Sequence, residues 1–364
     1  MTHMKSLKSL IGVFALLAFI SCAGSGAESI PLPEHPRPDF ERAQWMNLNG
    51  HWDFTFDEAV AAKALSGDYS AFDRKILVPF PWGSKLSEVE NEGDIGWYSR
   101  EIIVPKSWKG KRVFLVVGAS DWDTRVWLDG KEAGSHQGGY IPFECELEDV
   151  TFGQPQHLLI RADDTASDAH LYGKQGYGNA RGIWQTVYLE ARGENYIKSL
   201  HFSPDVDNSS VKVDVALASR AAEGEQFRLS FKTGGQAAFT LDMGGKSEAS
   251  FTIPIKGQHL WDIDDPFLYE VTASLGREDR VESYFGQRKV GVAKLPGADY
   301  NYVALNGKPI YLQLCLDQSY NPEGFYTFPS DEFMRNEILI SKNLGLSGNR
   351  IHIKVEVPRK LYWA

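Results

Sequence analysis

The sequence has few cysteines and no long run of basic residues. Three cysteines in 364 residues leave only Cys145 and Cys315 in the body of the chain, far apart and without Cys-x-x-Cys spacing. This excludes a disulfide scaffold and a zinc site built on paired cysteines, and we expect both thiols to be buried. The formal net charge is −10, and clustered cations that would bind phosphates are missing, which excludes a nucleic-acid partner.

Long apolar runs are also missing, apart from one at the N-terminus. Lys5 and Lys8 precede the run Leu10–Ile20, and small residues follow it to Ala27. This order is typical of a signal peptide over residues 1–27, and the run is shorter than the roughly 20 residues that span a bilayer. Because residues 19–22 resemble a bacterial lipoprotein box, a lipid anchor on Cys22 is an alternative. Both alternatives predict an exported bacterial protein that is periplasmic, secreted or an outer-membrane lipoprotein, with membrane contact only through that lipid.

The composition is that of a soluble globular protein. Hydrophobic residues make up 43% and charged residues 24% of the chain, and 364 residues predict two or three domains. Aromatic residues reach 12%, with 10 tryptophans. Most of these rings belong in cores, whereas a minority in a cleft would suit sugars, whose apolar C–H faces stack on aromatic rings.

Short alternating segments from residue 28 to 193 predict an all-β sandwich. Val113–Val117 is apolar on both faces, as in a strand covered on two sides. Asp129-Gly130 is typical of a type I′ hairpin turn, and Ile183–Leu189 predicts the closing strand. We expect Trp127 and Trp184 to be core residues.

A second sandwich is expected over residues 194–296. Short apolar segments recur there about every ten residues, and the length of about 100 residues is typical of a seven-stranded immunoglobulin-like sandwich. The predicted strands are 211–217, 226–232, 249–255, 268–275 and 280–285.

The pattern changes from residue 297 onward. After the turn Asn306-Gly307, Ile310–Leu316 predicts a fully buried strand, Ser330 caps a helix to about Leu344, and a strand over 351–355 precedes a helix at Pro358. This β-α-β-α order predicts a parallel sheet. Such a unit does not cover its own sheet faces and edges, and a (β/α)8 barrel takes about 250 residues. We therefore expect residues 297–364 to be the incomplete start of a barrel, and the chain to be an N-terminal fragment.

Motifs spread over the whole chain carry a family resemblance. They are Leu48-Asn49-Gly50-His51-Trp52, Gly96-Trp97-Tyr98-Ser99-Arg100, Trp127-Leu128-Asp129-Gly130, Arg181-Gly182-Ile183-Trp184, Tyr284-Phe285-Gly286-Gln287-Arg288 and Leu305-Asn306-Gly307-Lys308-Pro309. With these motifs in this order, the chain resembles the N-terminal portion of glycoside hydrolase family 2, which contains β-galactosidases, β-glucuronidases and β-mannosidases. The resemblance implies a jelly-roll sugar-binding domain, an immunoglobulin-like domain and a catalytic (β/α)8 barrel.

The resemblance also implies retaining hydrolysis of terminal β-linked sugars by two glutamates, one acid/base and one nucleophile about 5 Å apart. Both are implied to lie late in the barrel, beyond Ala364. Glu332, Glu337 and Glu356 are therefore expected to have structural or surface roles, and the chain alone is expected to be inactive.

Substrate-binding candidates come from the barrel start. The resemblance places Arg350 and His352 beside the nucleophile, although Asn349 replaces the usual apolar residue before the arginine. The alternative is an arginine paired with a structural carboxylate. Asp317 and Gln318 follow the first strand, at the end where barrel active sites form, and either bind hydroxyls or cap a loop.

Two loops of the first domain supply further candidates, Asn91 and Asp164, whose groups hydrogen-bond well to hydroxyls. The alternatives are a solvated acidic loop, or a structural Ca²⁺ or Mg²⁺ on Asp163, Asp164 and Asp168. We expect no other cofactor. The competing function is a non-catalytic carbohydrate-binding or interaction protein made of the two sandwiches.

Overall fold

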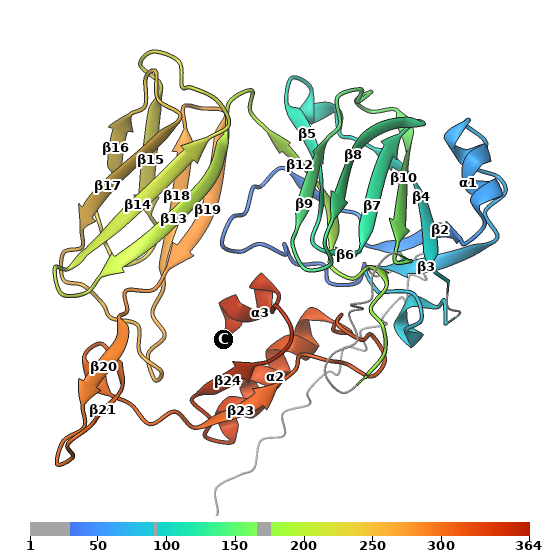
Figure 1. The fold of residues 1–364 in the computed structure, drawn as a ribbon. Helices are drawn as coiled ribbons and strands as arrows, with labels where there is room; N and C mark the ends of the chain where they lie inside the picture. The colour runs from blue at the N-terminus through green and yellow to red at the C-terminus, as the bar shows by residue number, and fades with distance from the viewer. Residues whose placement is uncertain (1–29, 91–92, 166–175) are drawn as a thin grey trace, which may run out of the picture.

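Two β-sandwiches lie side by side, with a smaller α/β unit below them (Figure 1). The structure is a computed structural model that describes residues 30–90, 93–165 and 176–364. The predicted signal peptide, with Cys22, lies outside the described residues. Within those ranges, no helix has the length and apolar character needed to cross a membrane.

The first sandwich packs a four-stranded antiparallel sheet, in the order β1-β12-β5-β9, on a six-stranded one, in the order β3-β2-β4-β10-β7-β8. Its core includes Trp52, Phe54, Tyr98 and Leu115, each at most 1% exposed. The strands are β1 (Trp45–Asn47), β2 (Gly50–Thr55), β3 (Arg74–Val78), β4 (Ile95–Ile103), β5 (Arg112–Val117), β7 (Asp123–Leu128), β8 (Lys131–Gln137), β9 (Phe143–Glu146), β10 (Pro155–Asp163) and β12 (Val187–Arg192); three short helices are α1 (Glu58–Leu65), η1 (Lys85–Ser87) and η2 (Lys106–Trp108).

Most local predictions for this sandwich are confirmed. β5 is buried on both faces, and φ is +48° at Asp129 and +79° at Gly130, as a type I′ turn requires. Trp127 and Trp184 are buried. Of the two thiols, Cys145 is buried, which raises its pKa to about 11, whereas Cys315 is only half-buried.

The predicted single strand Ile183–Leu189 is wrong. Its first residues form β11 (Gly182–Ile183), which pairs with β6 (Ser120–Asp121), and pairing resumes only at Val187. The cause is Trp184, whose indole N–H donates to the carbonyl of Gly139 at 2.7 Å and whose ring lies 5.6 Å from that of Tyr326. These contacts draw the chain out of the sheet.

The second sandwich packs a three-stranded sheet, β13-β14-β17, on a four-stranded one, β16-β15-β18-β19. The five predicted strands are confirmed, and β13 and β16 were not predicted. The core includes Phe227, Tyr269 and Val271, all fully buried. The strands are β13 (Ile197–Asp205), β14 (Ser210–Leu217), β15 (Gln226–Phe231), β16 (Phe239–Asp242), β17 (Glu248–Pro254), β18 (Tyr269–Leu275) and β19 (Asp279–Phe285).

The C-terminal unit has the predicted β-α-β-α order, with its two strands parallel. It follows a small antiparallel sheet whose turn at Asn306-Gly307 is as predicted. Ser330 caps the helix by accepting a hydrogen bond from the N–H of Phe333 at 3.0 Å. The elements are β20 (Val290–Lys294), β21 (Asn301–Leu305), β22 (Lys308–Pro309), β23 (Leu314–Asp317), α2 (Asp331–Asn343), β24 (Gly348–Ile351) and α3 (Pro358–Trp363).

Both parallel strands differ from the predictions. β23 is shorter than predicted and is not buried, because Leu314 and Leu316 are 41% and 55% exposed on a sheet face that the described residues leave open to solvent. The second strand is Gly348–Ile351 instead of the predicted 351–355; the chain leaves the sheet after Ile351, where Ile353 has φ of +69° and Lys354 is buried.

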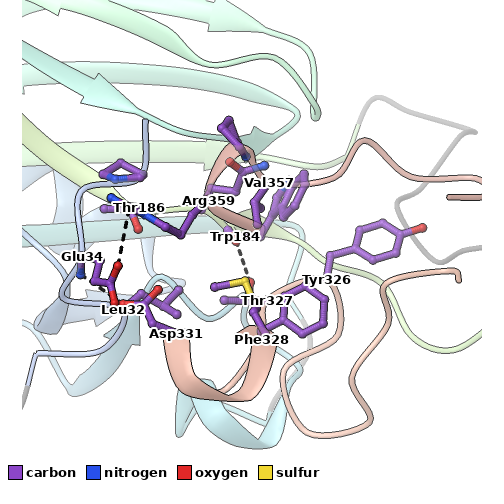
Figure 2. Close-up of a pocket in the computed structure, with 14 residues that line it drawn as sticks. Leu32, Glu34, Trp184, Thr186, Tyr326, Thr327, Phe328, Asp331, Val357 and Arg359 are labelled. Atoms are coloured by element: carbon purple, nitrogen blue, oxygen red, sulfur yellow. Dashed lines mark hydrogen bonds and ion pairs between the residues drawn. The ribbon is translucent and has the colours of Figure 1, made fainter. Parts of the chain in front are cut away.

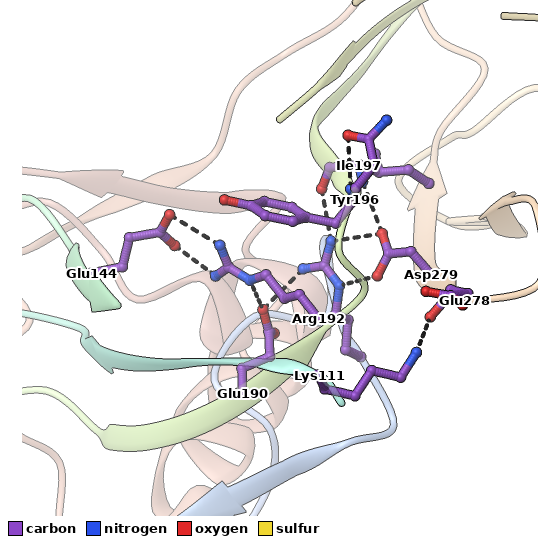
Figure 3. Close-up of polar contacts among 10 residues, drawn as sticks. Lys111, Glu144, Glu190, Arg192, Tyr196, Ile197, Glu278 and Asp279 are labelled. Atoms are coloured by element: carbon purple, nitrogen blue, oxygen red, sulfur yellow. Dashed lines mark hydrogen bonds and ion pairs between the residues drawn. The ribbon is translucent and has the colours of Figure 1, made fainter. Parts of the chain in front are cut away.

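Arg42 joins the two sandwiches by binding Glu190 and Asp279, two carboxylates that are labelled in Figure 3. Its guanidinium binds Asp279 of the second sandwich through two hydrogen bonds of 2.8 and 3.0 Å, and Glu190 of the first at 2.9 Å. It also donates to the carbonyl of Ile197 at 2.7 Å. All three charged side chains are at most 3% exposed, so each charge depends on this pairing.

Replacing Arg42 with methionine leaves Asp279 and Glu190 as buried carboxylates deprived of this partner. We expect a loss of about 3–5 kcal/mol in the free energy of unfolding, and separate unfolding of the two sandwiches. Calorimetry and urea unfolding measure both effects. The control is Arg228→Met, at an exposed arginine. An equal loss in its free energy of unfolding would contradict the role of Arg42 in joining the two sandwiches.

His35 is a buried neutral histidine on the segment that precedes the first strand. Its ring packs edge-on against Trp45 and Tyr188, with centroids 4.5 and 5.4 Å away, and its Nδ1 accepts a hydrogen bond from the N–H of Arg37 at 3.1 Å. Burial, reinforced by the nearby Arg359 guanidinium, lowers the pKa of His35 to about 3.

Acid should therefore destabilise the protein through His35. Between pH 6.5 and about 3 the unfolded chain binds a proton that the folded chain does not, so stability falls as the pH falls through this window. We expect His35→Phe, which cannot be protonated there, to lose less stability between pH 7 and pH 4 than the wild type in urea unfolding. The exposed His201→Phe should behave as the wild type does; equal acid sensitivity in all three would refute the role of His35.

Candidate functional site

The carboxyl ends of β23 and β24 bring three of the predicted site residues together. Leu316 pairs with Arg350 in the parallel register, and the N–H of His352 continues the pairing by donating to the carbonyl of Asp317 at 2.9 Å. Since side chains alternate along a strand, Gln318, Arg350 and His352 share one face with Leu316. This is the open face of the sheet.

Polar atoms on this face are left without partners. Gln318 Oε1 and His352 Nδ1 are buried, and neither has a hydrogen-bond partner among the described residues. Arg350 is exposed, and its guanidinium makes no ion pair within the same part of the chain. Buried polar atoms are normally hydrogen-bonded, so this amide and imidazole, beside the exposed guanidinium, are candidate partners for a polar ligand.

Asp317 lies on the other face, toward the helices. Its carboxylate is 3.1 Å from the ammonium of Lys360 and accepts a hydrogen bond from the N–H of Ser319 at 2.6 Å. Burial opposes its ionisation, but Lys360 and the Ser319 N–H hold the pKa of Asp317 below its usual value. The structure favours the loop-capping alternative for this residue.

Asp164 is tied into the first sandwich. Its side chain is 1% exposed and lies 3.1 Å from Nε of Arg181, which also donates to the carbonyl of Gly93 at 3.2 Å. It is therefore a buried ion pair and not a solvated loop residue. Asn91 lies outside the described residues.

The described part of the acidic loop, up to Thr165, is held by an ion pair within the sandwich. Asp163 pairs with Arg161 at 2.7 Å, and Asp168 lies outside the described residues. Among the residues that the structure describes, no three His, Cys, Asp or Glu side chains form a group that would hold a metal ion.

The loop between β23 and α2 packs directly on the first sandwich (Figure 2). Thr327 Oγ1 donates to the carbonyl of Trp184 at 2.6 Å. A Cβ added to Gly178 would lie 2.8 Å from the ring of Phe325, so only glycine allows this approach. Tyr140 reaches over from the sandwich, with its hydroxyl 3.5 Å from the carbonyl of Ile353. The first sandwich thus borders the rim of the parallel sheet, which is the edge at the carboxyl ends of β23 and β24 where Gln318 and His352 lie.

A buried charge cluster lies beside this rim, and the sequence analysis did not identify it. The ammonium of Lys360 is 3.1 Å from Asp317, 3.1 Å from Glu337 and 3.2 Å from Glu356. Lys354 and Glu356 are 8% and 6% exposed. No signal in the sequence indicated this cluster, because the alternation of these charged residues with Ile353 and Val355 ordinarily predicts that the apolar side chains are the covered ones.

The three glutamates of this unit make contacts within the fold. Glu337 and Glu356 share Lys360, and Glu356 also accepts hydrogen bonds from Ser319 and from the N–H of Val357. Glu332 is exposed in the first turn of α2, where it complements the helix dipole. Ion pairing and helix-dipole contacts of this kind stabilise the fold, and the structural roles of these glutamates stay a prediction.

Asp164→Asn tests whether this carboxylate serves the fold. The variant leaves Arg181 without its buried counter-ion, and we expect the free energy of unfolding to fall by about 3 kcal/mol. Asp94→Asn is the matched control, because Asp94 is 3.7 Å from the same arginine but 69% exposed, and should cost less than about 1 kcal/mol. Equal losses in urea unfolding would contradict the assignment.

Two family models match the chain. The model of the glycosyl hydrolases family 2 sugar binding domain matches residues 45–190, and that of glycosyl hydrolases family 2 matches residues 195–288. A β-glucuronidase from Bacteroides fragilis is 27% identical over 263 residues, covering 64% of this chain and 35% of the relative. A β-galactosidase from Thermoanaerobacter pseudethanolicus is 24% identical over 56% of this chain and 29% of the relative.

Solved structures share the fold. A family 2 β-galacturonidase from Eisenbergiella tayi bound to galacturonate superposes with a TM-score of 0.71 at 21% identity, over 91% of this chain and 57% of that one. The β-glucuronidase of Ruminococcus gnavus gives a TM-score of 0.70 at 18% identity, over 90% and 58%. The chain spans about a third of the length of the two curated relatives, the β-glucuronidase from Bacteroides fragilis and the β-galactosidase from Thermoanaerobacter pseudethanolicus. From its two matched domains, in the order predicted from the motifs, this chain belongs to glycoside hydrolase family 2.

Proposed function

We propose that this chain is the sugar-recognising N-terminal portion of an exported retaining β-glycosidase. In this proposal the first sandwich is the jelly-roll sugar-binding domain, and residues 297–364 begin a catalytic (β/α)8 barrel. The observation that carries the proposal is the group Gln318, Arg350 and His352. It has free hydrogen-bonding capacity on one sheet face, at the carboxyl ends of parallel strands where barrel active sites form.

The chemistry of these three groups suits a sugar beside an ionised carboxylate. The Gln318 amide and the His352 imidazole are hydrogen-bonding partners for hydroxyls. Arg350 carries a permanent charge, which favours the ionised form of a neighbouring carboxylate and so would keep a nucleophilic glutamate ready for attack on the anomeric carbon. A second, protonated glutamate would donate its proton to the leaving oxygen.

The glutamates for these steps would come from later barrel strands. Glu337 and Glu356 are held by Lys360, and Glu332 faces solvent at the start of α2. The exposed Leu314 and Leu316 lie on the face that would line the barrel interior, which supports further strands packing there.

The substrate class follows from the relatives. Those reported above are named β-glucuronidase, β-galactosidase and β-galacturonidase, and all act on β-linked sugars. We therefore propose a terminal β-linked sugar as substrate.

A binding experiment tests the site on the chain itself, without its leader. We expect one of methyl β-glucuronide, methyl β-galactoside and methyl β-mannoside to bind in saturation-transfer NMR, and Gln318→Ala and His352→Ala each to weaken its Kd about fivefold, because each removes one hydrogen bond. Glu332→Gln is the control and should leave the Kd unchanged. Absence of binding to all three glycosides, or binding that survives both alanine variants, would overturn the proposed site. Survival would favour a carbohydrate-binding role of the sandwiches alone.

Hydrolysis tests the assignment of the catalytic glutamates. We expect the chain to release nitrophenol from nitrophenyl β-glycosides no faster than buffer does, because the proposal assigns both glutamates of the pair to later barrel strands. Turnover that is abolished by Glu356→Gln or Glu337→Gln would contradict this assignment.

A further inference from the structure

Lys354 is a buried lysine whose ammonium holds both ends of one loop. It is 8% exposed, and its Nζ donates to the carbonyls of Ser319 and Tyr326, each at 2.8 Å. These two residues lie near the start and the end of the loop that joins β23 to α2. A single side chain from the segment after β24 therefore closes this loop.

The same ammonium also reaches the first sandwich. It lies 5.5 Å from the ring centroid of Trp184, 5.1 Å from that of Tyr326 and 4.9 Å from that of Phe328. Trp184 is fully buried and belongs to the sandwich, whereas the other two rings belong to the loop. Cation–π attraction of this kind is strongest where water is excluded, so Lys354 joins the loop and the sandwich.

The backbone on both sides of this contact has uncommon conformations. Ile353 has φ of +69°, a region that β-branched residues rarely occupy, and Ser319 has φ of +49°. Such conformations persist only where surrounding contacts impose them. Ser319 is held at its carbonyl by Lys354 and at its hydroxyl by Glu356. The two residues with positive φ directly follow Gln318 and His352.

We propose that Lys354 is a positioning residue, which fixes the loop between β23 and α2 on the first sandwich and thereby sets the positions of Gln318 and His352 for the ligand. The inference rests on the proposed function for the identity of that ligand, but the positioning itself is a property of this chain. Lys354 does not touch the ligand in this assignment, because its donors are directed to the two carbonyls.

The charged groups around Lys354 affect the pKa of its ammonium. Glu356 faces it from its own segment, Asp317 from β23, Glu337 from α2 and Lys360 from α3. Burial outweighs the nearby carboxylates and lowers the pKa of Lys354 to about 8. A lysine released into water titrates near 10.5, so raising the pH from about 8 to 10.5 favours the closed loop over the open one.

Hydrogen exchange tests the positioning without any ligand. We expect Lys354→Met to raise amide exchange at least about tenfold in peptides covering residues 318–328, with residues 197–285 unchanged, and Lys354→Arg to restore part of the protection. Lys342→Met, at an exposed lysine of α2, is the control. Unchanged exchange in 318–328, or an equal rise throughout residues 197–364, would overturn the proposal.

Lysine NMR supplies a readout that general destabilisation would not produce. With ¹³C-labelled lysine, one resonance should titrate near pH 8 in the wild type and be missing in Lys354→Met, while Lys342→Met retains it. Persistence of this resonance in Lys354→Met, or its loss in Lys342→Met, would mean that Lys354 is not the buried amine, and would overturn the proposal.

Ligand binding then separates this inference from the proposed function. Lys354→Met should weaken the Kd of the bound methyl glycoside about fivefold, and Lys354→Arg less. If the wild type binds no glycoside, the proposed function fails, while the exchange and NMR results still decide the role of Lys354. If the wild type binds and Lys354→Met leaves the Kd unchanged, the positioning role fails alone.

Discussion

The burial of Arg42 between two carboxylates of different domains is the constraint on which the arrangement of the molecule depends. Asp279 and Glu190 belong to separate sandwiches, and each would be a costly buried charge without the shared guanidinium. The network of buried charges continues into the first sandwich, because Arg192 pairs with Glu190 at 2.7 Å and binds Glu144 through two further hydrogen bonds. The relative position of the two sandwiches is therefore set by the pairing of buried charges. An apolar contact would not fix this position, because its two surfaces could slide past each other.

A second junction, of different chemistry, positions the candidate site. Trp184 leaves its sheet, and the loop between β23 and α2 covers it with Tyr326, while Thr327 hydrogen-bonds to its carbonyl. Lys354 supplies the charge at this junction. Because the rim of the parallel strands is built against the first sandwich, the geometry of Gln318 and His352 depends on a domain that holds neither residue.

The sequence was most informative where local rules decide the structure. Turn chemistry at Asp129-Gly130 and Asn306-Gly307 and the cap at Ser330 depend on neighbouring residues only, and all three are confirmed. The prediction was wrong where tertiary contacts override local preference. Ile183–Leu189 has strand propensity throughout, yet the packing of Trp184 interrupts it.

The candidate site shows the same division. Gln318, Arg350 and His352 were predicted from strand order and family motifs, and the structure places them at the ends of two paired parallel strands. Asp317 was proposed for the same ligand, but only the position of α3 shows that Lys360 occupies its carboxylate. Lys354 was missed because no local pattern predicts that a lysine after a strand turns inward to two carbonyls 35 and 28 residues away.

Among the residues that the structure describes, buried polar atoms without hydrogen-bond partners also occur in the scaffold, for example at Trp97 and Asn195, so the candidate site is set apart by where its atoms lie, at the ends of two parallel strands. Arg42, Asp164 and Asp317 are buried or half-buried charged residues whose charges are met within the chain, so their cost is offset by the fold itself. Within the part of the chain that the structure describes, Gln318 Oε1 and His352 Nδ1 are buried without such partners, and beside them Arg350 keeps its charge in solvent. Burying polar atoms without hydrogen bonds costs free energy that folding alone does not recover, whereas a ligand that supplies those hydrogen bonds does. The open face of the parallel strands is therefore where binding energy is available, and the two junctions keep it in a fixed geometry.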